Sequence, residues 1–101
     1  MLWEMTMYAK VTRYETKPGM ASESLALMEQ MKEQIMSLPG LRQFINIMDE
    51  DGAGYVIGIW KDREAAFANE EQEKQMWQAY ADYLEPLEAA AGHEVQANWT
   101  A

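Results

Sequence analysis

The chain has 101 residues, of which 49% are hydrophobic and 25% are charged, and its formal net charge at pH 7 is −9. This length and composition predict one globular domain over residues 1–101 and exclude a disordered chain. The acidic balance disfavours binding to nucleic acid and to anionic lipid surfaces. Since no stretch approaches the ~20 apolar residues of a membrane span, we expect neither a nucleic acid nor a membrane as a partner.

Cysteine is absent and His93 is the only histidine. These counts exclude a disulfide framework, a thiolate nucleophile and a metal site built from cysteines or several histidines, so we expect no bound metal. The first four residues contain no basic segment followed by an apolar run, so we expect no signal peptide. Together with the lack of cysteine, this favours a cytoplasmic location.

The first half of the chain contains a strand signal and then a helix signal. Alternation predicts a strand over residues 3–14, which Pro18-Gly19 ends. Apolar residues at helical spacing predict a helix over residues 20–38, which Pro39-Gly40 ends. Along the strand, one alternating set is apolar and the other is polar: Met5, Met7, Ala9 and Val11 against Thr6, Tyr8, Lys10 and Thr12.

A hairpin follows, with strands over residues 41–48 and 55–60 and an acidic, glycine-bearing loop over residues 49–54. Both strands carry apolar residues on both faces, so both faces of their sheet need to be covered. One chain this short covers one face with helices, and we expect a second copy to cover the other, as a homodimer. The alternating sets are Leu41, Ile45 and Ile47 against Phe44 and Met48, then Tyr55, Ile57 and Ile59 against Val56 and Trp60.

The last third of the chain predicts two more helices and a strand. Asp62 is suited to cap a short helix through Phe67, and a longer helix is predicted over residues 71–85. A last strand is predicted over residues 93–99. The order βαββαβ predicts an α+β, ferredoxin-like sandwich, in which a four-stranded antiparallel sheet carries its helices on one face.

Aromatic residues are the main candidates for a binding site. Gly58 lies within a strand on the face of Val56 and Trp60, where a missing side chain often marks the close approach of another group. The same aromatic spacing is also typical of an ordinary core, and both interpretations stay open. The candidate pocket consists of Val56, Gly58, Trp60, Phe67, Trp77 and Tyr80, with Tyr80 and Tyr83 as candidate hydroxyl donors.

Several short motifs resemble the antibiotic biosynthesis monooxygenase family of dimeric α/β barrels. They are Pro39-Gly40-Leu41 before a strand, a strand ending in Trp60-Lys61-Asp62, the following Arg63-Glu64-Ala65-Ala66-Phe67, and Lys17-Pro18-Gly19 after the first strand. The resemblance covers nearly the whole chain in element order. It implies the dimeric α/β-barrel fold.

The resemblance carries over only part of the known functional residues. The family branch that oxygenates polycyclic polyketides without metal or flavin has an Asn four residues before the Trp and a Tyr six residues after it. Trp60 matches, but the other two positions hold Val56 and Ala66. The haem-degrading branch has Asn, Trp and His where this chain has Thr12, Asn69 and Ala79, so we do not expect haem degradation.

The resemblance implies a monooxygenase, that is, an oxidoreductase, which needs no cofactor. Its substrate would be a small electron-rich aromatic such as a quinol or phenol. In such chemistry the substrate anion itself reduces dioxygen, and the protein supplies an apolar cavity, orientation and a hydrogen bond to the anion. The alternative is a non-catalytic dimeric domain that binds a small apolar ligand or serves only assembly. A cavity beside Trp60 with converging polar groups would favour the enzyme.

Overall fold

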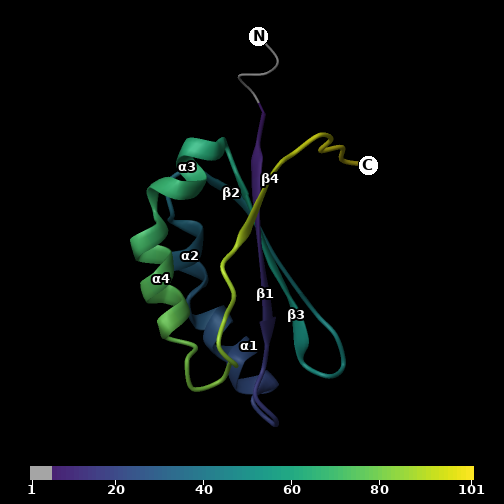
Figure 1. The fold of residues 1–101 in the computed structure, drawn as a ribbon, viewed down its shortest axis with the longest axis vertical. Helices are drawn as coiled ribbons and strands as arrows, with labels where there is room; N and C mark the ends of the chain where they lie inside the picture. The colour runs from purple at the N-terminus through teal and green to yellow at the C-terminus, as the bar shows by residue number, and fades with distance from the viewer. Residues whose placement is uncertain (1–5) are drawn as a thin grey trace.

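The computed structural model describes residues 6–101, and these follow the predicted order of strands and helices. Each of the two helical segments is split in two (Figure 1). The predicted start of the first strand, residues 3–5, lies outside the described residues. The elements are β1 (Tyr8–Glu15), α1 (Ala21–Gln30), α2 (Lys32–Met36), β2 (Leu41–Met48), β3 (Ala53–Trp60), α3 (Arg63–Ala68), α4 (Glu70–Gln78) and β4 (Ala91–Glu94).

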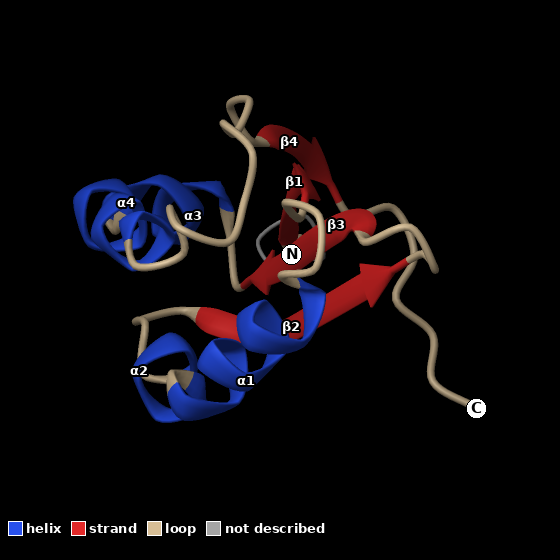
Figure 2. Cartoon of the chain, turned by 90° about the horizontal axis from the view of Figure 1, so that it is seen from below, coloured by secondary structure: helices blue, strands red, loops and turns tan. Residues whose placement is uncertain are grey.

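The four strands form one antiparallel sheet in the order β2-β3-β1-β4. This is the predicted ferredoxin-like arrangement. Figure 2 shows the helices on one side of the sheet, with α3 and α4 as one pair and α1 and α2 as another. Within the described part of the chain, none of these helices is long and apolar enough to cross a membrane.

The hairpin begins and ends close to its predicted limits, although β3 starts at Ala53, two residues earlier than expected. Gly52 adopts the left-handed φ of 85° that the tight loop requires, and its N–H donates to the Asp49 carbonyl at 3.0 Å. The Thr16 hydroxyl donates to the Gly52 carbonyl at 3.0 Å and so ties the loop to the end of β1.

The alternation of β2 is irregular because a bulge lies between Leu41 and Gln43. Leu41 pairs with Trp60, whereas Gln43 pairs with Ile59 on the opposite face. The prediction that Leu41 shares a face with Ile45 and Ile47 was therefore wrong. Leu41 packs on the helix-covered face instead.

The predicted helix over residues 20–38 is interrupted at Met31, which separates α1 from α2. The Met31 N–H is shared between the carbonyls of Leu27 and Met28, at 3.0 and 3.1 Å, so the turn tightens there. The Met31 side chain is buried, and the bend therefore keeps the helical segment against the sheet.

The second helical segment has the predicted break and the predicted cap. The Asp62 carboxylate accepts the Ala65 N–H at 2.8 Å and begins α3. However, α4 ends at Gln78 and not at residue 85. The backbone after α4 pairs with the end of β1 and the residues that follow it: the Lys17 N–H donates to the Tyr83 carbonyl and the Glu85 N–H to the Glu15 carbonyl, each at 2.8 Å.

The last strand was predicted over residues 93–99 but is observed as Ala91–Glu94. It pairs with β1 from Ala91 opposite Val11 to Glu94 opposite Tyr8. Tyr8 is the first residue of β1, and one further bond follows, in which the Val95 N–H donates to the Met7 carbonyl at 3.0 Å. Residues 95–101 lie beyond the strand.

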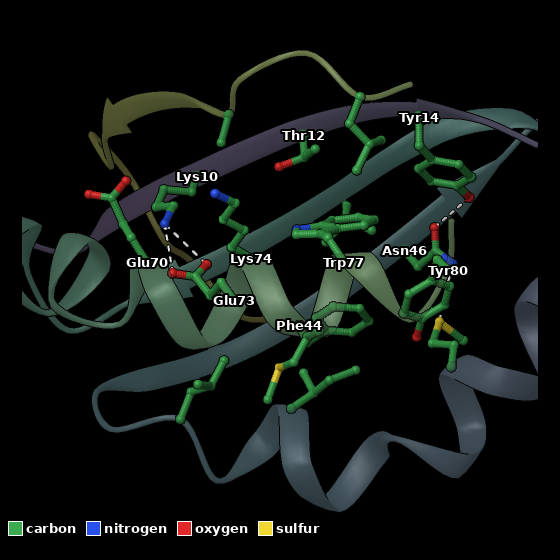
Figure 3. A pocket seen from close by; sticks show the side chains of 18 of the residues that line it. Lys10, Thr12, Tyr14, Phe44, Asn46, Glu70, Glu73, Lys74, Trp77 and Tyr80 are labelled. Carbon is green, nitrogen blue, oxygen red and sulfur yellow. Dashed lines mark hydrogen bonds and ion pairs between the residues drawn. The ribbon is translucent and has the colours of Figure 1, made fainter. Parts of the chain in front are cut away.

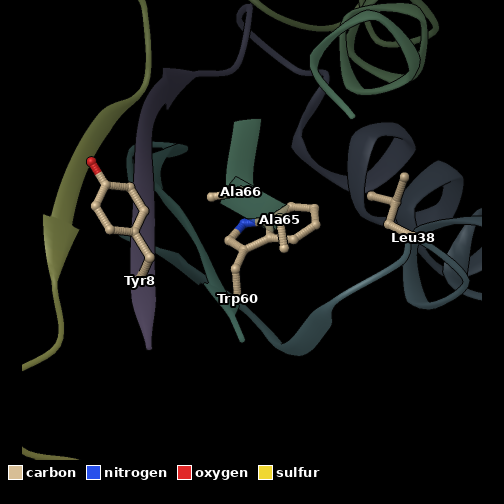
Figure 4. Packing of buried hydrophobic residues seen from close by; sticks show 5 residues of the cluster. All are labelled: Tyr8, Leu38, Trp60, Ala65 and Ala66. Carbon is tan, nitrogen blue, oxygen red and sulfur yellow. The ribbon is translucent and has the colours of Figure 1, made fainter. Parts of the chain in front are cut away.

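The helix-covered face holds two core clusters. Figure 4 shows the first, in which Ala65 and Ala66 of α3 pack against the Trp60 indole with Tyr8 and Leu38 nearby. The small alanine side chains let α3 approach the sheet closely. The second cluster joins the sheet to the α1–α2 segment and to the residues after α4 through Tyr14, Met31, Ile35, Tyr80 and Leu84.

Within the described part of the chain, no helix covers the opposite face of the sheet, and this face is mainly apolar. Its central row consists of Val11, Ile57 and Ile45, which are neighbours across β1, β3 and β2. Ile45 is 40% exposed, and the flanking Ile47 and Tyr55 are 49% and 42% exposed. This open apolar face has the composition that the two-sided hairpin predicted.

Candidate functional site

A cavity of about 390 Å³ lies between the sheet and the helices (Figure 3). Side chains of β1, β2, β3, α1, α2 and α4 line it, together with residues 87–90. Five of the six residues of the candidate pocket are among the lining residues: Val56, Gly58, Trp60, Trp77 and Tyr80.

Trp60 belongs both to the core and to the cavity wall. It is 2% exposed and is the largest fully buried side chain among the described residues. A Cβ atom added at Gly58 would lie 3.1 Å from Trp60 Nε1, so the indole of Trp60 occupies part of the space that Gly58 leaves. Gly58 therefore allows Trp60 to lie flat along its own strand and still borders the cavity.

Phe67 and Tyr83 lie elsewhere. The Phe67 ring is 40% exposed and packs against Tyr8, with ring centroids 5.6 Å apart. Tyr83 is half-buried, and its backbone carbonyl accepts the Lys17 N–H. Neither residue lines the cavity.

One face of the second helical segment forms the roof of the cavity. Met76 and Trp77 follow Glu73 by three and four residues and precede Tyr80 by four and three, which places all of them on one face. The Trp77 and Tyr80 rings are tilted against each other with centroids 5.9 Å apart. Burial raises the pKa of the Tyr80 hydroxyl, which is therefore a neutral phenol at pH 7.

An ion pair closes one end of the cavity. The Lys10 ammonium of β1 donates to the Glu73 carboxylate at 2.9 and 3.1 Å and to the Ala66 carbonyl at 2.8 Å. It also lies 5.6 Å from the Trp60 ring centroid and 5.3 Å from that of Phe67. Burial raises the pKa of the Glu73 carboxyl, although the hydrogen bond from Lys10 opposes this.

A neutral hydrogen-bonded pair lies at the other end. The Tyr14 hydroxyl of β1 donates to Asn46 Oδ1 of β2 at 2.6 Å, and Asn46 Nδ2 faces the Met28 sulfur at 3.2 Å. Burial raises the pKa of Tyr14, the hydrogen bond with Asn46 lowers it, and the charge of Asp49 raises it further. Figure 3 shows this pair and the Lys10–Glu73 pair at opposite ends of the aromatic middle.

Sequence reasoning missed the polar ends of the cavity, Lys10, Glu73, Tyr14 and Asn46. One signal was available in β1, where Lys10, Thr12 and Tyr14 share the face that turned out to be covered. Another was Asn46, a single amide in the row of Phe44 and Met48. Asn46 also lies directly opposite Val56 in the β2–β3 pairing. Val56 occupies the position that holds an Asn in the polyketide-oxygenating branch of the family.

His93 lies in β4 and is exposed. Among residues 6–101, no three His, Cys, Asp or Glu side chains are close enough together to hold a metal ion.

Similar folds occur in solved structures of low sequence identity. A protein of unknown function from Nitrosomonas europaea is 19% identical with a TM-score of 0.80, over 97% of this chain and 97% of that chain. A conserved protein from Methanosarcina mazei Go1 is 14% identical with a TM-score of 0.74, over 91% and 95%. SnoaB, a cofactor-independent oxygenase from Streptomyces nogalater, is 16% identical with a TM-score of 0.67, over 94% and 96%.

No match was found among curated proteins. At identities below 20%, the solved structures support the fold alone. The sequence profile of the family described as antibiotic biosynthesis monooxygenase matches residues 7–82, which is most of the chain and includes β1 through α4. The chain therefore belongs to the antibiotic biosynthesis monooxygenase family.

Proposed function

We propose that the protein is a cofactor-independent monooxygenase that oxidises a small electron-rich aromatic of the phenol or quinol type. The observation that carries this proposal is the cavity, which combines aromatic walls with hydrogen-bonding groups at its ends. A cavity of about 150 Å³ can hold benzene, so a volume of about 390 Å³ has room for two or three fused rings. Membership of the family supports the reaction class.

The reaction needs no external reductant when a phenol becomes a quinone. A hydroxyarene such as 1-naphthol loses its O–H proton to give an anion, which reduces dioxygen. One oxygen atom enters the ring carbon opposite the hydroxyl as a carbonyl, the C–H hydrogen is lost from that carbon, and the other oxygen atom leaves as water. The protein would orient the ring between Trp77 and the sheet and stabilise the anion, for which the Tyr80 hydroxyl is one candidate donor.

We also propose that the active form is a homodimer. Its support is the open apolar face of β1, β2 and β3, on which three large apolar side chains, Ile45, Ile47 and Tyr55, are each at least 40% exposed. Stable interfaces bury roughly 800 Å² per partner, and a face of this kind suits a second copy of itself.

A second candidate is a domain that binds an apolar ligand without reacting with it. Two residues favour this candidate. Val56 and Ala66 stand where the polyketide-oxygenating branch has an Asn and a Tyr, so both polar groups are missing here. Ala66 is also 0% exposed and packs in the core. Such a domain would bind the same aromatic compounds in the same cavity.

The test measures oxygen uptake and product formation with 1-naphthol and 1,4-naphthohydroquinone. We expect catalysed conversion of 1-naphthol with one labelled oxygen atom from dioxygen in the product. Val56→Phe, which places a larger side chain in the cavity, should abolish it, whereas Leu25→Phe, at a position that is 37% exposed on α1, should not. Binding of naphthols without oxygen uptake above that of the buffer would favour the second candidate.

A further inference from the structure

The Tyr14–Asn46 contact joins two strands that are not neighbours. β3 lies between β1 and β2, so the Tyr14 and Asn46 side chains meet above β3 on the cavity side. Their distance of 2.6 Å is short for an O–H···O hydrogen bond. Tyr14 is 4% exposed, and its ring is fixed within the second core cluster.

This contact fixes the orientation of the Asn46 amide. The Tyr14 hydroxyl donates to Oδ1 at 2.6 Å, a much shorter contact than its 3.3 Å to the Ile47 carbonyl, and burial raises the Tyr14 pKa and keeps the hydroxyl protonated. The NH₂ group is thereby turned toward the Met28 sulfur at 3.2 Å. Turning the amide over would place its oxygen against the thioether, which has no proton to donate.

The Asn46 NH₂ group is therefore nearly unused. A thioether is a weak acceptor, and among residues 6–101 the amide donates no other hydrogen bond. Its acceptor is already occupied by Tyr14. A ligand in the cavity thus meets a donor at Asn46, and a donor favours an anionic oxygen over a neutral hydroxyl.

We infer that Asn46 is the residue that binds the ionised oxygen of the aromatic ligand, displacing the Met28 thioether, and that Tyr14 is its positioning residue. The ring then extends along the cavity past Phe44 and Trp77 toward Lys10. The two polar ends are separated by the four-residue step from Tyr14 to Lys10 on β1, which is about 13 Å at ~3.3 Å per residue. This inference rests on the proposed function for the identity of the anion.

The preference for an anion is measured with a chromophoric probe, 4-nitro-1-naphthol, whose neutral and ionised forms absorb at different wavelengths. Titrating the full chain with the probe across the probe's pKa gives separate dissociation constants for naphthol and naphtholate. The wild type should favour naphtholate. Asn46→Leu should lose naphtholate affinity by roughly ten- to hundredfold, the worth of a hydrogen bond to a charged group, while naphthol affinity changes by less than about threefold.

Three further variants separate the anion contact from a loss of structure. Asn46→Asp keeps the size of the side chain but replaces NH₂ by an oxygen, so it should weaken naphtholate binding more than Asn46→Leu does. Tyr14→Phe leaves the donor in place but frees the amide to turn, so its effect on the anion preference should be smaller. Gln43→Leu removes an amide from the opposite face of the same strand and should leave the preference unchanged.

The outcomes distinguish this inference from the proposed function. If naphtholate preference survives in Asn46→Leu, the inference fails while the cavity remains the binding site. If the preference depends on Asn46 but 1-naphthol gives no catalysed oxygen uptake, the inference stands and the oxygenase proposal fails. If the wild type binds neither form of the probe, both are overturned.

Discussion

Removing the two partners of the Lys10–Glu73 pair should have unequal effects on stability. Lys10→Met keeps a side chain of similar length but removes three donated hydrogen bonds, to Ala66 at 2.8 Å and to Glu73 at 2.9 and 3.1 Å. A buried carbonyl left unsatisfied costs about 1–3 kcal/mol, and the Glu73 carboxylate, 19% exposed, loses its cation as well. We expect Lys10→Met to lower the free energy of unfolding by about 2–4 kcal/mol.

Glu73→Gln should cost less than about 1 kcal/mol. The Gln side-chain oxygen can still accept an N–H from Lys10, and Lys10 keeps its hydrogen bond to the Ala66 carbonyl. Burial raises the pKa of Glu73, which means that folding disfavours the carboxylate relative to the unfolded chain, so a neutral amide loses less here than at an exposed ion pair. The double variant Lys10→Met/Glu73→Gln should be about 1 kcal/mol more stable than Lys10→Met alone, because it leaves no carboxylate without its cation.

Urea unfolding at neutral pH, followed by tryptophan fluorescence, measures these differences for the wild type, both single variants and the double variant. Lys61→Met, at an exposed position, is the matched control and should change stability by less than about 0.5 kcal/mol. If Glu73→Gln costs as much as Lys10→Met, Coulomb attraction dominates and the reasoning is refuted. A cost below about 1 kcal/mol for Lys10→Met would show that the Ala66 contact contributes little.

Three other measurements test the core, the titration and the assembly. Trp60→Ala should lower the free energy of unfolding by about 3–5 kcal/mol, because the side chain is 2% exposed, and Trp60→Phe should cost less. A loss below about 1 kcal/mol in Trp60→Ala would mean that the Trp60 side chain is not packed as part of the core. Because the folded pKa of Glu73 is raised, its stabilising contribution is complete below its unfolded pKa and is lost as pH rises through the folded pKa. The stability of the wild type minus that of Glu73→Gln should therefore fall as the pH rises above 4.5, and a rise would contradict the shift. Ile57→Asp, at the centre of the open face, should convert a dimer into a monomer in sedimentation velocity; a wild type that is monomeric at micromolar concentration would rule the dimer out.

The fold could be predicted because its signals are local. Pro39-Gly40 and Asp62 mark the ends of elements through backbone restrictions and capping, and both act over a few residues. Boundaries failed where a distant strand decides them. The last strand ends opposite the first residue of β1, and the helical segment ends before the backbone that pairs with Glu15 and Lys17. No property of residues 71–85 or 93–99 alone carries that information.

The candidate site was predictable in its apolar part and not in its polar part. Aromatic spacing predicted that Trp60, Trp77 and Tyr80 lie on one side of the sheet, and they line the cavity. The Lys10–Glu73 and Tyr14–Asn46 contacts join residues that are 63 and 32 positions apart. Such contacts depend on the register between strands and on the placement of α4, which no spacing along the chain reveals.

The strand β1 shows why polar residues matter for the fold as well as for the site. Its polar set, including Lys10 and Tyr14, faces the helices, while Ala9 and Val11 face the open side. By hydrophobicity alone the opposite assignment would be preferred, and a slip of one residue would produce it. The ion pair of Lys10 at one end of the covered face and the hydrogen bond of Tyr14 at the other both disappear in that slipped register. The same two contacts that close the ends of the cavity therefore hold β1 in the register that directs its apolar side chains to the proposed dimer face.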